Sequence, residues 1–240
     1  MLEMIPKIIH YCWFGRGEMP QLALDCIASW HKHMPDWEYK LWDEESFDVN
    51  SVPYVKEAYE AHKYAFVSDY VRLFALKHFG GLYLDVDFEV FKPFDILLTH
   101  SAFAGYEGSK HSPVMMGVLA SEPDGEWVNE HLSNYTGRHF VRPDGSYDMT
   151  TNVSFNTGNM IREGLVCDGV EKDFRGLHIF PVDYFCPRQT TGEYIKTGNT
   201  FCDHKGLDSW NESKRMNLIL RIAGPKFSIK LIKLKRKILG

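Results

Sequence analysis

The fold is decided by one stretch of eight residues, Gly80-Gly81-Leu82-Tyr83-Leu84-Asp85-Val86-Asp87. The double glycine ends a helical segment and starts a turn, because glycine adopts the backbone conformations that helix ends require. The apolar run that follows is typical of a short buried strand. Asp85 and Asp87 are two residues apart, so in an extended chain their side chains point to the same side. The stretch therefore predicts a helix, a tight turn and a buried strand that ends in two acids.

The segments around this stretch alternate between strand and helix patterns. Helices are predicted at residues 21–33 and about 54–78, and strands at 7–14, 39–42 and 88–91. Such alternation over the first hundred residues predicts an α/β layered fold.

Beyond Pro93 the patterns weaken. We expect a strand at residues 102–106, a helix at 127–135 and a late edge strand at 179–181. Residues 136–160 are rich in Gly, Thr, Asn and Asp, and this composition predicts loops near a binding site.

The acidic pair predicts a site for a divalent cation and a diphosphate. In open α/β sheets, ligands gather outside the carboxyl ends of the strands. Two neighbouring carboxylates repel each other, and a hard cation relieves this repulsion and can bridge to phosphate oxygens. The alternative is an ordinary solvated turn, since Asp is common at such positions.

Asp69 and Arg72 lie three residues apart on the helix before the turn, so they share one face. As an ordinary surface ion pair they would contribute only about 0.3–0.5 kcal/mol. As site residues, Asp69 would accept hydrogen bonds from sugar hydroxyls, and Arg72 would steady the site or the departing phosphate. The residues alone leave both interpretations open.

Taken together, Ser68-Asp69-Tyr70-Val71-Arg72 and the stretch at 80–87 resemble the core signature of glycosyltransferase family 32. This group of DXD-containing sugar transferases includes capsular polysaccharide enzymes and yeast α-mannosyltransferases. The glucosylating domains of large clostridial toxins carry a similar signature. The resemblance spans residues 5–98 and returns near residues 184–187 and 204–210.

The resemblance implies a GT-A type fold, a single Rossmann-like α/β domain with a mixed central sheet, and transfer with retention of anomeric configuration. Its cofactor would be Mn²⁺ or Mg²⁺, and its donor a nucleotide-sugar. The residues and the resemblance together give these candidate roles: catalysis for Asp69, Arg72 and Asp87; metal binding for Asp85, Asp87 and His204; and donor binding for Trp13, Asp69, Arg72, Tyr83, Asp85, Ser209 and Trp210.

Three of the ring-bearing residues have an alternative in the core. Trp13 closes the first strand, and the resemblance implies that it stacks on the nucleotide base, a contact that contributes about 1–3 kcal/mol. Tyr83 shares a strand face with Asp85 and would touch the sugar or phosphates, unless its ring packs in the core. His10 is expected to be a core histidine rather than a ligand.

His204 stands where the family places a histidine shortly before a Ser-Trp pair. Family members often carry two adjacent histidines, whereas here Lys205 follows, so a metal role for His204 stays open and Lys205 is an alternative phosphate contact. Ser209 and Trp210 would lie on a mobile loop that covers the donor and excludes water.

The net charge of −5 conceals an asymmetry. No Asp or Glu follows Glu212, whereas the last 28 residues carry nine Lys or Arg, which leaves residues 1–212 with a balance of −14. Because a body this acidic binds nucleic acid poorly, we expect no nucleic-acid partner. Two parts are predicted: a GT-A domain at residues 1–212 and a basic, amphipathic helical tail at 213–240.

The tail carries two parallel stripes at helical spacing, a basic one of Lys226, Lys230, Lys233 and Lys237 and an apolar one of Phe227, Leu231, Leu234 and Ile238. A helix of this kind can lie on an anionic membrane surface. Packing on the domain with a solvated lysine edge is the alternative.

Five cysteines, an odd number without a C-x-x-C motif, argue against a disulfide framework or a structural zinc site. No stretch approaches the ~20 apolar residues that a membrane span needs. We therefore expect a cytoplasmic protein, peripheral on the inner face of the cell membrane if its tail binds lipid.

The sequence predicts a metal-dependent hexosyltransferase that moves a sugar from a nucleotide-sugar, UDP being favoured, to a glycan or lipid-linked glycan in capsular, exo- or lipopolysaccharide synthesis. Glu107, Asn152 and Asn156 are acceptor-side candidates without a ranking. The alternatives are a metal-dependent hydrolase of nucleotide-sugars and a non-catalytic carbohydrate-binding module. The intact acids and arginine of the signature argue against the module.

Overall fold

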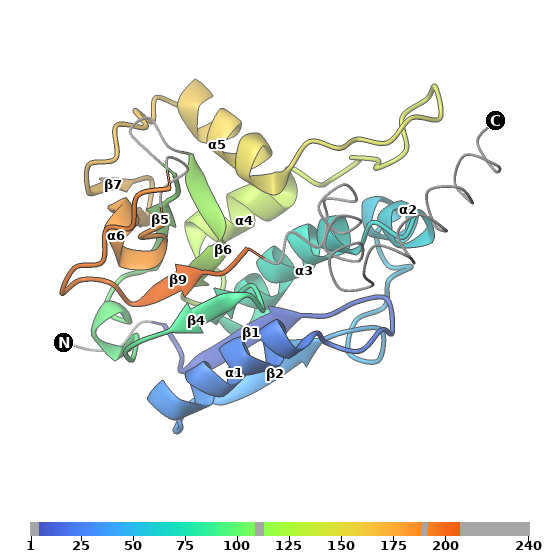
Figure 1. Ribbon diagram of the computed structural model, residues 1–240. Coiled ribbons are helices and arrows are strands. Elements are labelled where there is room, and N and C mark those ends of the chain that lie inside the picture. The colour runs from blue at the N-terminus through green and yellow to red at the C-terminus, as the bar shows by residue number, and fades with distance from the viewer. Residues whose placement is uncertain (1–4, 109–112, 189–191, 207–240) are drawn as a thin grey trace. The chain divides into compact units, whose positions relative to one another are not determined.

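The computed structural model describes residues 5–108, 113–188 and 192–206 (Figure 1). The Ser209–Trp210 loop, the predicted boundary at residue 212 and the basic tail lie outside these ranges.

In these three ranges the fold is built on a seven-stranded sheet with the strand order β2-β1-β3-β6-β5-β8-β7. Its strands are β1 (Ile8–Cys12), β2 (Glu38–Trp42), β3 (Gly81–Leu84), β5 (Ala102–Tyr106), β6 (Val114–Ser121), β7 (Lys172–Phe174) and β8 (Leu177–Phe180). β1 is parallel to β2 and β3, and β5 is parallel to β8, whereas β6 is antiparallel to both β3 and β5 and β7 to β8. The α/β class and the mixed central sheet are therefore confirmed.

Helices cover both faces of this sheet (Figure 1). They are α1 (Gln21–His33), α2 (Pro53–Glu60), α3 (Tyr64–Phe79), the 3₁₀ turn η1 (Asp95–Leu97), α4 (Glu126–Ser133), α5 (Asn152–Arg162) and α6 (Val182–Phe185). Alternate residues of β3 point to opposite faces. Tyr83 belongs to a core cluster with residues of α2, α3 and α4, whereas Leu82 and Leu84 belong to a second cluster with residues of α1.

A small ribbon lies beside the main sheet, where β4 (Phe88–Val90) pairs antiparallel with β9 (Cys202–His204). Helix α1 holds this ribbon, because the buried Trp30 donates a hydrogen bond of 2.6 Å from Nε1 to the carbonyl of Phe88. The ribbon brings the end of the described chain next to the acidic pair.

The double glycine forms the turn that the sequence predicts, and neither residue can be replaced without strain. Gly80 and Gly81 have φ values of +63° and +104°, a region that L side chains rarely adopt. A Cβ on Gly81 would also lie 2.5 Å from the carbonyl oxygen of Ile8. His10 reinforces the turn with a hydrogen bond of 2.8 Å between its Nε2 and the Gly80 carbonyl.

The helix predicted at residues 54–78 is two helices. α2 ends at Glu60 and α3 begins at Tyr64, and between them His62 has a φ of +56°. A non-glycine residue in this left-handed region interrupts a right-handed helix. The alanines at 58, 61 and 65 concealed the break, because they suit a helix on either side of it.

Beyond Pro93 one strand was not predicted and two expectations were wrong. β6 was missed, because its apolar residues are buried on both faces and show no alternation. α5 was taken for part of a loop, since its residues are weak helix formers; the Thr151 side chain caps it by accepting a hydrogen bond from the Ser154 amide. β8 is not an edge strand, because β7 pairs along its outer side.

Candidate active site

The carboxyl ends of three strands bring candidate residues to one edge of the sheet. β1 pairs in parallel with β3, with His10 opposite Tyr83, so Trp13 and Asp85 both project beyond this edge. β5 has the same direction as β3, since each is antiparallel to β6, and Glu107 follows the end of β5. Ligands of open α/β sheets bind at such an edge.

Arg72 is the centre of the hydrogen-bond network at this edge. Its guanidinium donates from Nη2 to Asp69 Oδ1 at 2.9 Å, from Nη1 to the carbonyl of Met116 at 2.5 Å and from Nε to the carbonyl of Ser68 at 3.2 Å. The side chain is only 6% exposed. Because these donors are engaged within the protein, Arg72 ties α3 to β6 and sets the position of Asp69. A direct contact between Arg72 and the donor stays a prediction.

Asp69 is buried beside this guanidinium. Burial raises the pKa of Asp69 to about 7, against the lowering effect of Arg72 and of the hydrogen bond from the backbone amide of Asn152. The first turn of α5 therefore meets α3 at this carboxyl group. A contact between Asp69 and sugar hydroxyls stays a prediction.

Asp85 is held on one side by two neighbours. Its Oδ1 accepts a hydrogen bond of 2.8 Å from the Tyr83 hydroxyl and lies 3.5 Å from Nη2 of Arg72. The Tyr83 ring is buried and lies under the guanidinium, 4.6 Å from ring centroid to Arg72 Cζ. The Asp85 side chain itself is 36% exposed, so the rest of it faces the outside of the sheet edge.

Asp87 is paired with His204 across the ribbon, with 3.1 Å between Oδ2 and Nε2. The imidazole also stacks on Phe88, with 4.7 Å between centroids. Burial alone would lower the pKa of His204, but the hydrogen bond and the charge of Asp87, with Asp85 and Glu107 nearby, raise it to about 9. An imidazolium cannot bind a metal ion, so His204 would have to lose this proton to act as a ligand.

Lys205 faces away from this site. Its ammonium lies 2.6 Å from Glu89 Oε2 and 3.2 Å from Asp203 Oδ2, and Asp203 is fully buried. Successive side chains of an extended chain point to opposite sides, so His204 and Lys205 cannot both reach the acidic pair. The phosphate contact offered for Lys205 is therefore wrong for this arrangement.

Trp13 and His10 take the positions that the sequence predicts. Trp13 is half-buried one residue after β1, and its Nε1 donates to the carbonyl of Gly17 at 2.6 Å, which fixes the indole plane. Base stacking by this ring stays a prediction. His10 is fully buried and burial lowers its pKa to about 4. Trp42 Nε1 donates to His10 Nδ1, so His10 is a neutral core residue.

Of the three acceptor-side candidates, two lie beside the site and the third lies further along α5. Burial raises the pKa of Glu107, the charge of His204 opposes this and the charge of Asp85 adds to it, so Glu107 lies within electrostatic range of the acidic pair. Asn152 meets Asp69 through its backbone amide. Asn156 lies one turn further along α5 and is 1% exposed. Glu107 and Asn152 thus adjoin the site.

The sequence did not reveal the contribution of β6. The Gly117 carbonyl accepts a hydrogen bond of 2.9 Å from the amide of Asp85. A Cβ on Gly117 would lie 2.8 Å from Asp85 Oδ2 and 2.7 Å from Cε2 of Phe88. The missing side chain therefore lets the Asp85 carboxylate and the Phe88 ring lie close against the backbone of β6. Only the pairing of β6 with β3 could have identified this glycine, and β6 had no recognisable pattern.

A divalent cation at this edge would be coordinated jointly by protein carboxylates and substrate phosphates. Among the residues that the structure describes, no group of three or more His, Cys, Asp or Glu is arranged to hold a metal ion. Mg²⁺ commonly takes one or two carboxylates and completes its shell with water and substrate phosphates. Asp85 and Asp87 are the residues that would supply those carboxylates.

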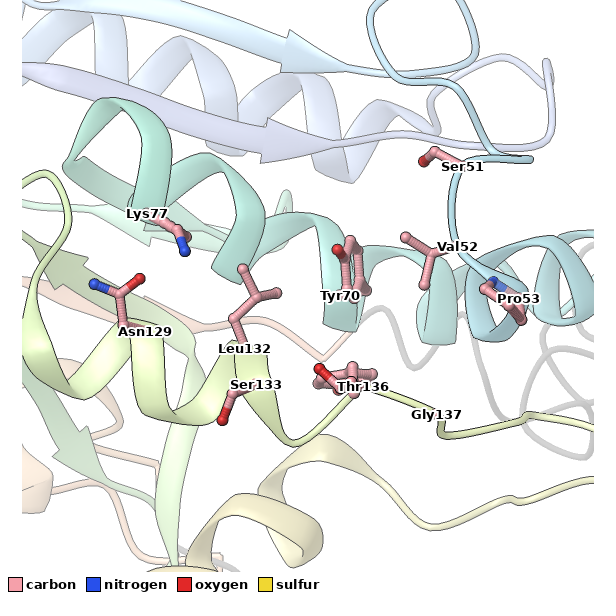
Figure 2. A pocket seen from close by; sticks show the side chains of 11 residues that line it. Ser51, Val52, Pro53, Tyr70, Lys77, Asn129, Leu132, Ser133, Thr136 and Gly137 are labelled. Carbon is pink, nitrogen blue, oxygen red and sulfur yellow. The ribbon is translucent and has the colours of Figure 1, made fainter.

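A separate groove of about 420 Å³ lies between α3 and α4 and the start of α2 (Figure 2). Its lining combines hydroxyl, amide, ammonium and apolar groups, from Ser51, Val52, Pro53, Tyr70, Lys77, Asn129, Leu132, Ser133, Tyr135, Thr136 and Gly137. None of these is a candidate site residue, and the acidic pair does not line the groove.

Within the described ranges, no helix has the length and apolar content to cross a bilayer.

Comparison with known proteins agrees with the signature. "Inositol phosphoceramide mannosyltransferase 1" of Schizosaccharomyces pombe is 30% identical over 150 residues, which cover 59% of this chain and 47% of that protein. "Mannosyl phosphorylinositol ceramide synthase SUR1" of Saccharomyces cerevisiae is 32% identical over 127 residues, 50% of this chain and 32% of that protein. The chain thus spans less than half the length of these relatives.

Solved glycosyltransferase structures show a weaker likeness. "PaToxG Glycosyltransferase" aligns with a TM-score of 0.49 at 18% identity, covering 67% of this chain and 70% of that one. The galactosyltransferase LgtC, solved with donor and acceptor sugar analogs, aligns with a TM-score of 0.44 at 13% identity, covering 88% and 94%. These scores add no argument to the fold described above.

The family described as "Glycosyltransferase sugar-binding region containing DXD motif" matches residues 20–104. This range contains both halves of the signature, from Asp69 and Arg72 on α3 to Asp85 and Asp87 after β3. Residues 20–104 of the chain are therefore similar to the DXD-containing sugar-binding region of glycosyltransferases, in agreement with the resemblance drawn from the signature.

Proposed function

We propose that the chain is a metal-dependent, retaining glycosyltransferase of the GT-A type that transfers a hexosyl group from a nucleotide-sugar to a glycan or lipid-linked acceptor. The observation that carries the proposal is the meeting of Asp69, Arg72 and Asp85 at the carboxyl end of β3, within one network and beside Asp87. An ordinary helix ion pair does not require these further partners.

In this proposal each part of the sheet edge has one task. Trp13 offers its ring to the nucleotide base, Asp69 accepts hydrogen bonds from sugar hydroxyls, and Arg72 holds Asp69 in place. Asp85 and Asp87 would hold Mn²⁺ or Mg²⁺, which supplies positive charge to the departing diphosphate. The protein's contribution is then mainly electrostatic and positional.

Retention is proposed to need no protein nucleophile. As the bond between the sugar and the diphosphate breaks, the departing diphosphate oxygen takes the proton of the acceptor hydroxyl. The hydroxyl oxygen then bonds to the sugar on the same face that the diphosphate leaves. Water must be kept out while this happens, because it competes with the acceptor. We assign this task to Ser209 and Trp210, which lie outside the described residues.

The relatives favour mannose as the sugar and a lipid acceptor, because one is named an inositol phosphoceramide mannosyltransferase and the other a mannosyl phosphorylinositol ceramide synthase. A donor with a GDP group therefore joins the UDP-sugars as a candidate. The relatives give no support to a setting in capsular, exo- or lipopolysaccharide synthesis.

The experiment measures nucleotide release from UDP- and GDP-sugars with Mn²⁺, with and without inositol phosphoceramide in micelles, and the anomeric configuration of the product. The proposal expects release that rises with acceptor and a product with the donor's configuration. Rapid release that the acceptor does not change would favour a nucleotide-sugar hydrolase. Binding of glycans without any release would favour a carbohydrate-binding module.

A further inference from the structure

The first acid of the pair presents its two oxygens to different surroundings. Asp85 Oδ1 is turned into the protein, where the Tyr83 hydroxyl donates to it at 2.8 Å and Arg72 Nη2 lies at 3.5 Å. Asp85 Oδ2 lies next to Gly117, at a place where any Cβ would approach it to 2.8 Å. The carboxylate is therefore held in one orientation, by Tyr83 and Arg72 at Oδ1 and by the close approach of Gly117 at Oδ2.

Tyr83 is itself buried in the sheet. It is 1% exposed, lies in the middle of the sheet between β1 and β6, and its ring packs on the guanidinium of Arg72 at 4.6 Å. A phenol in this position has no surface left for a sugar or a phosphate. The sequence prediction that Tyr83 contacts the donor therefore does not match its surroundings, whereas its hydroxyl has one evident partner.

The backbone completes the arrangement. The Asp85 amide donates to the Gly117 carbonyl at 2.9 Å, so the main chain at the end of β3 is fixed to β6. The main chain and Oδ1 are thus both held. Oδ2 is the oxygen of Asp85 that accepts no hydrogen bond from the described residues.

We infer that Tyr83 is a positioning residue, which acts through Asp85 by holding Oδ1 inward so that Oδ2 faces the divalent cation and the donor diphosphate. This inference rests on the proposed function. A ligand held by a hydrogen bond from a second residue does not have to be ordered when the cation binds, and loss of such outer contacts typically costs about 10–100-fold in metal affinity or activity.

Tyr83→Phe removes the hydroxyl and keeps the ring that packs on Arg72. The test uses the full chain and measures Mn²⁺ affinity by electron paramagnetic resonance, in the presence of UDP or GDP, and the melting temperature without metal. We expect Mn²⁺ binding about tenfold weaker than in the wild type. Tyr39→Phe is the matched control, because Tyr39 lies on β2 and its hydroxyl donates to the Met34 carbonyl at the end of α1, not to either acid of the pair. Its Mn²⁺ affinity should not change.

The other side of the carboxylate gives a second variant, which serves if Tyr83→Phe does not fold. Gly117→Ala places a methyl group against Oδ2 and should weaken Mn²⁺ binding by a similar factor. Mn²⁺ affinity equal to that of the wild type in either folded variant would overturn the inference.

Asp85→Asn separates the inference from the proposed function. If the wild type binds Mn²⁺ with nucleotide and Asp85→Asn does not, the result supports the proposed metal site. In that case, equal Mn²⁺ binding by Tyr83→Phe and the wild type overturns the positioning role alone. If the wild type binds no Mn²⁺, or Asp85→Asn binds it as well as the wild type, the metal site and the positioning role are both overturned.

Discussion

At the scale of single residues, the site depends on buried charges that hold one another. Arg72 lies between two carboxylates, and removal of one member of a buried pair usually destabilises a protein, since the other charge is left without a partner. Substitution of Arg72 therefore tests folding as much as activity. The exposed part of Asp85 and the oxygens of Asp87 are the better targets for a test of chemistry.

Buried histidines give the molecule a predictable response to acid. Burial lowers the pKa of His131 to about 4, against the opposing hydrogen bond to the Trp127 carbonyl, while an unfolded histidine has a pKa near 6.5. Below pH 6.5 His131 is protonated in the unfolded chain, whereas in the folded chain it stays largely neutral until the pH approaches 4. The free energy of unfolding should therefore fall as the pH falls from about 6.5 to 4, by up to about 3 kcal/mol for this residue.

His131→Leu removes this titratable group. The slope of the free energy of unfolding against pH should therefore decrease by up to the contribution of one bound proton. The measurement is urea unfolding at several pH values between 4 and 7. His10, whose pKa burial also lowers to about 4, keeps part of the slope in the variant. Equal slopes in the two proteins would show that His131 titrates normally in the folded state.

At the scale of elements, the signature was predictable because its local signals are strong. Helix α1 and strands β1 to β5 follow from apolar runs, helical spacing and the double glycine, each of which acts within a few residues. β6 and α5 do not carry such signals. β6 is stabilised by pairing with β3 and β5 on both sides, and α5 by packing on β6, so distant contacts determine them.

The same distinction applies to the site. The acids and the arginine were visible from their spacing, whereas Gly117 and the Met116 carbonyl come from the strand that could not be recognised. The loop prediction for residues 136–160 holds up to Thr151, and Figure 1 shows this connection reaching out from the body before α5 begins.

The turn before β3 gives a prediction at this scale. Gly81→Ala combines a φ of +104° with a Cβ 2.5 Å from the Ile8 carbonyl, and should cost about 2–4 kcal/mol of unfolding free energy. Gly145→Ala is the control, because its φ is +82° and no atom lies within 4 Å of the new Cβ; it should cost about 1 kcal/mol. Chemical denaturation measures both, and equal losses would contradict the proposed close approach of β3 and β1.

At the scale of the whole molecule, the basic tail is proposed to bring a cytoplasmic enzyme to an anionic membrane, where a lipid-linked acceptor resides. Deletion of residues 226–240 should abolish binding to vesicles that contain phosphatidylserine and leave turnover of a soluble acceptor unchanged. Sedimentation with vesicles at two salt concentrations measures the first, and a release assay the second. Vesicle binding that persists in the deleted chain would assign the membrane contact to another surface.

The central claim is that Asp85 and Asp87 bind a divalent cation together with the donor diphosphate. Calorimetric titration of UDP and GDP into the full chain, with Mn²⁺ and with EDTA, tests it most directly when it is repeated with Asp87→Asn. The account predicts that Mn²⁺ tightens the binding of one nucleotide at least about tenfold in the wild type, and that the folded variant loses this difference. Nucleotide binding that is equal with Mn²⁺ and EDTA, or equally Mn²⁺-dependent in Asp87→Asn, would contradict it.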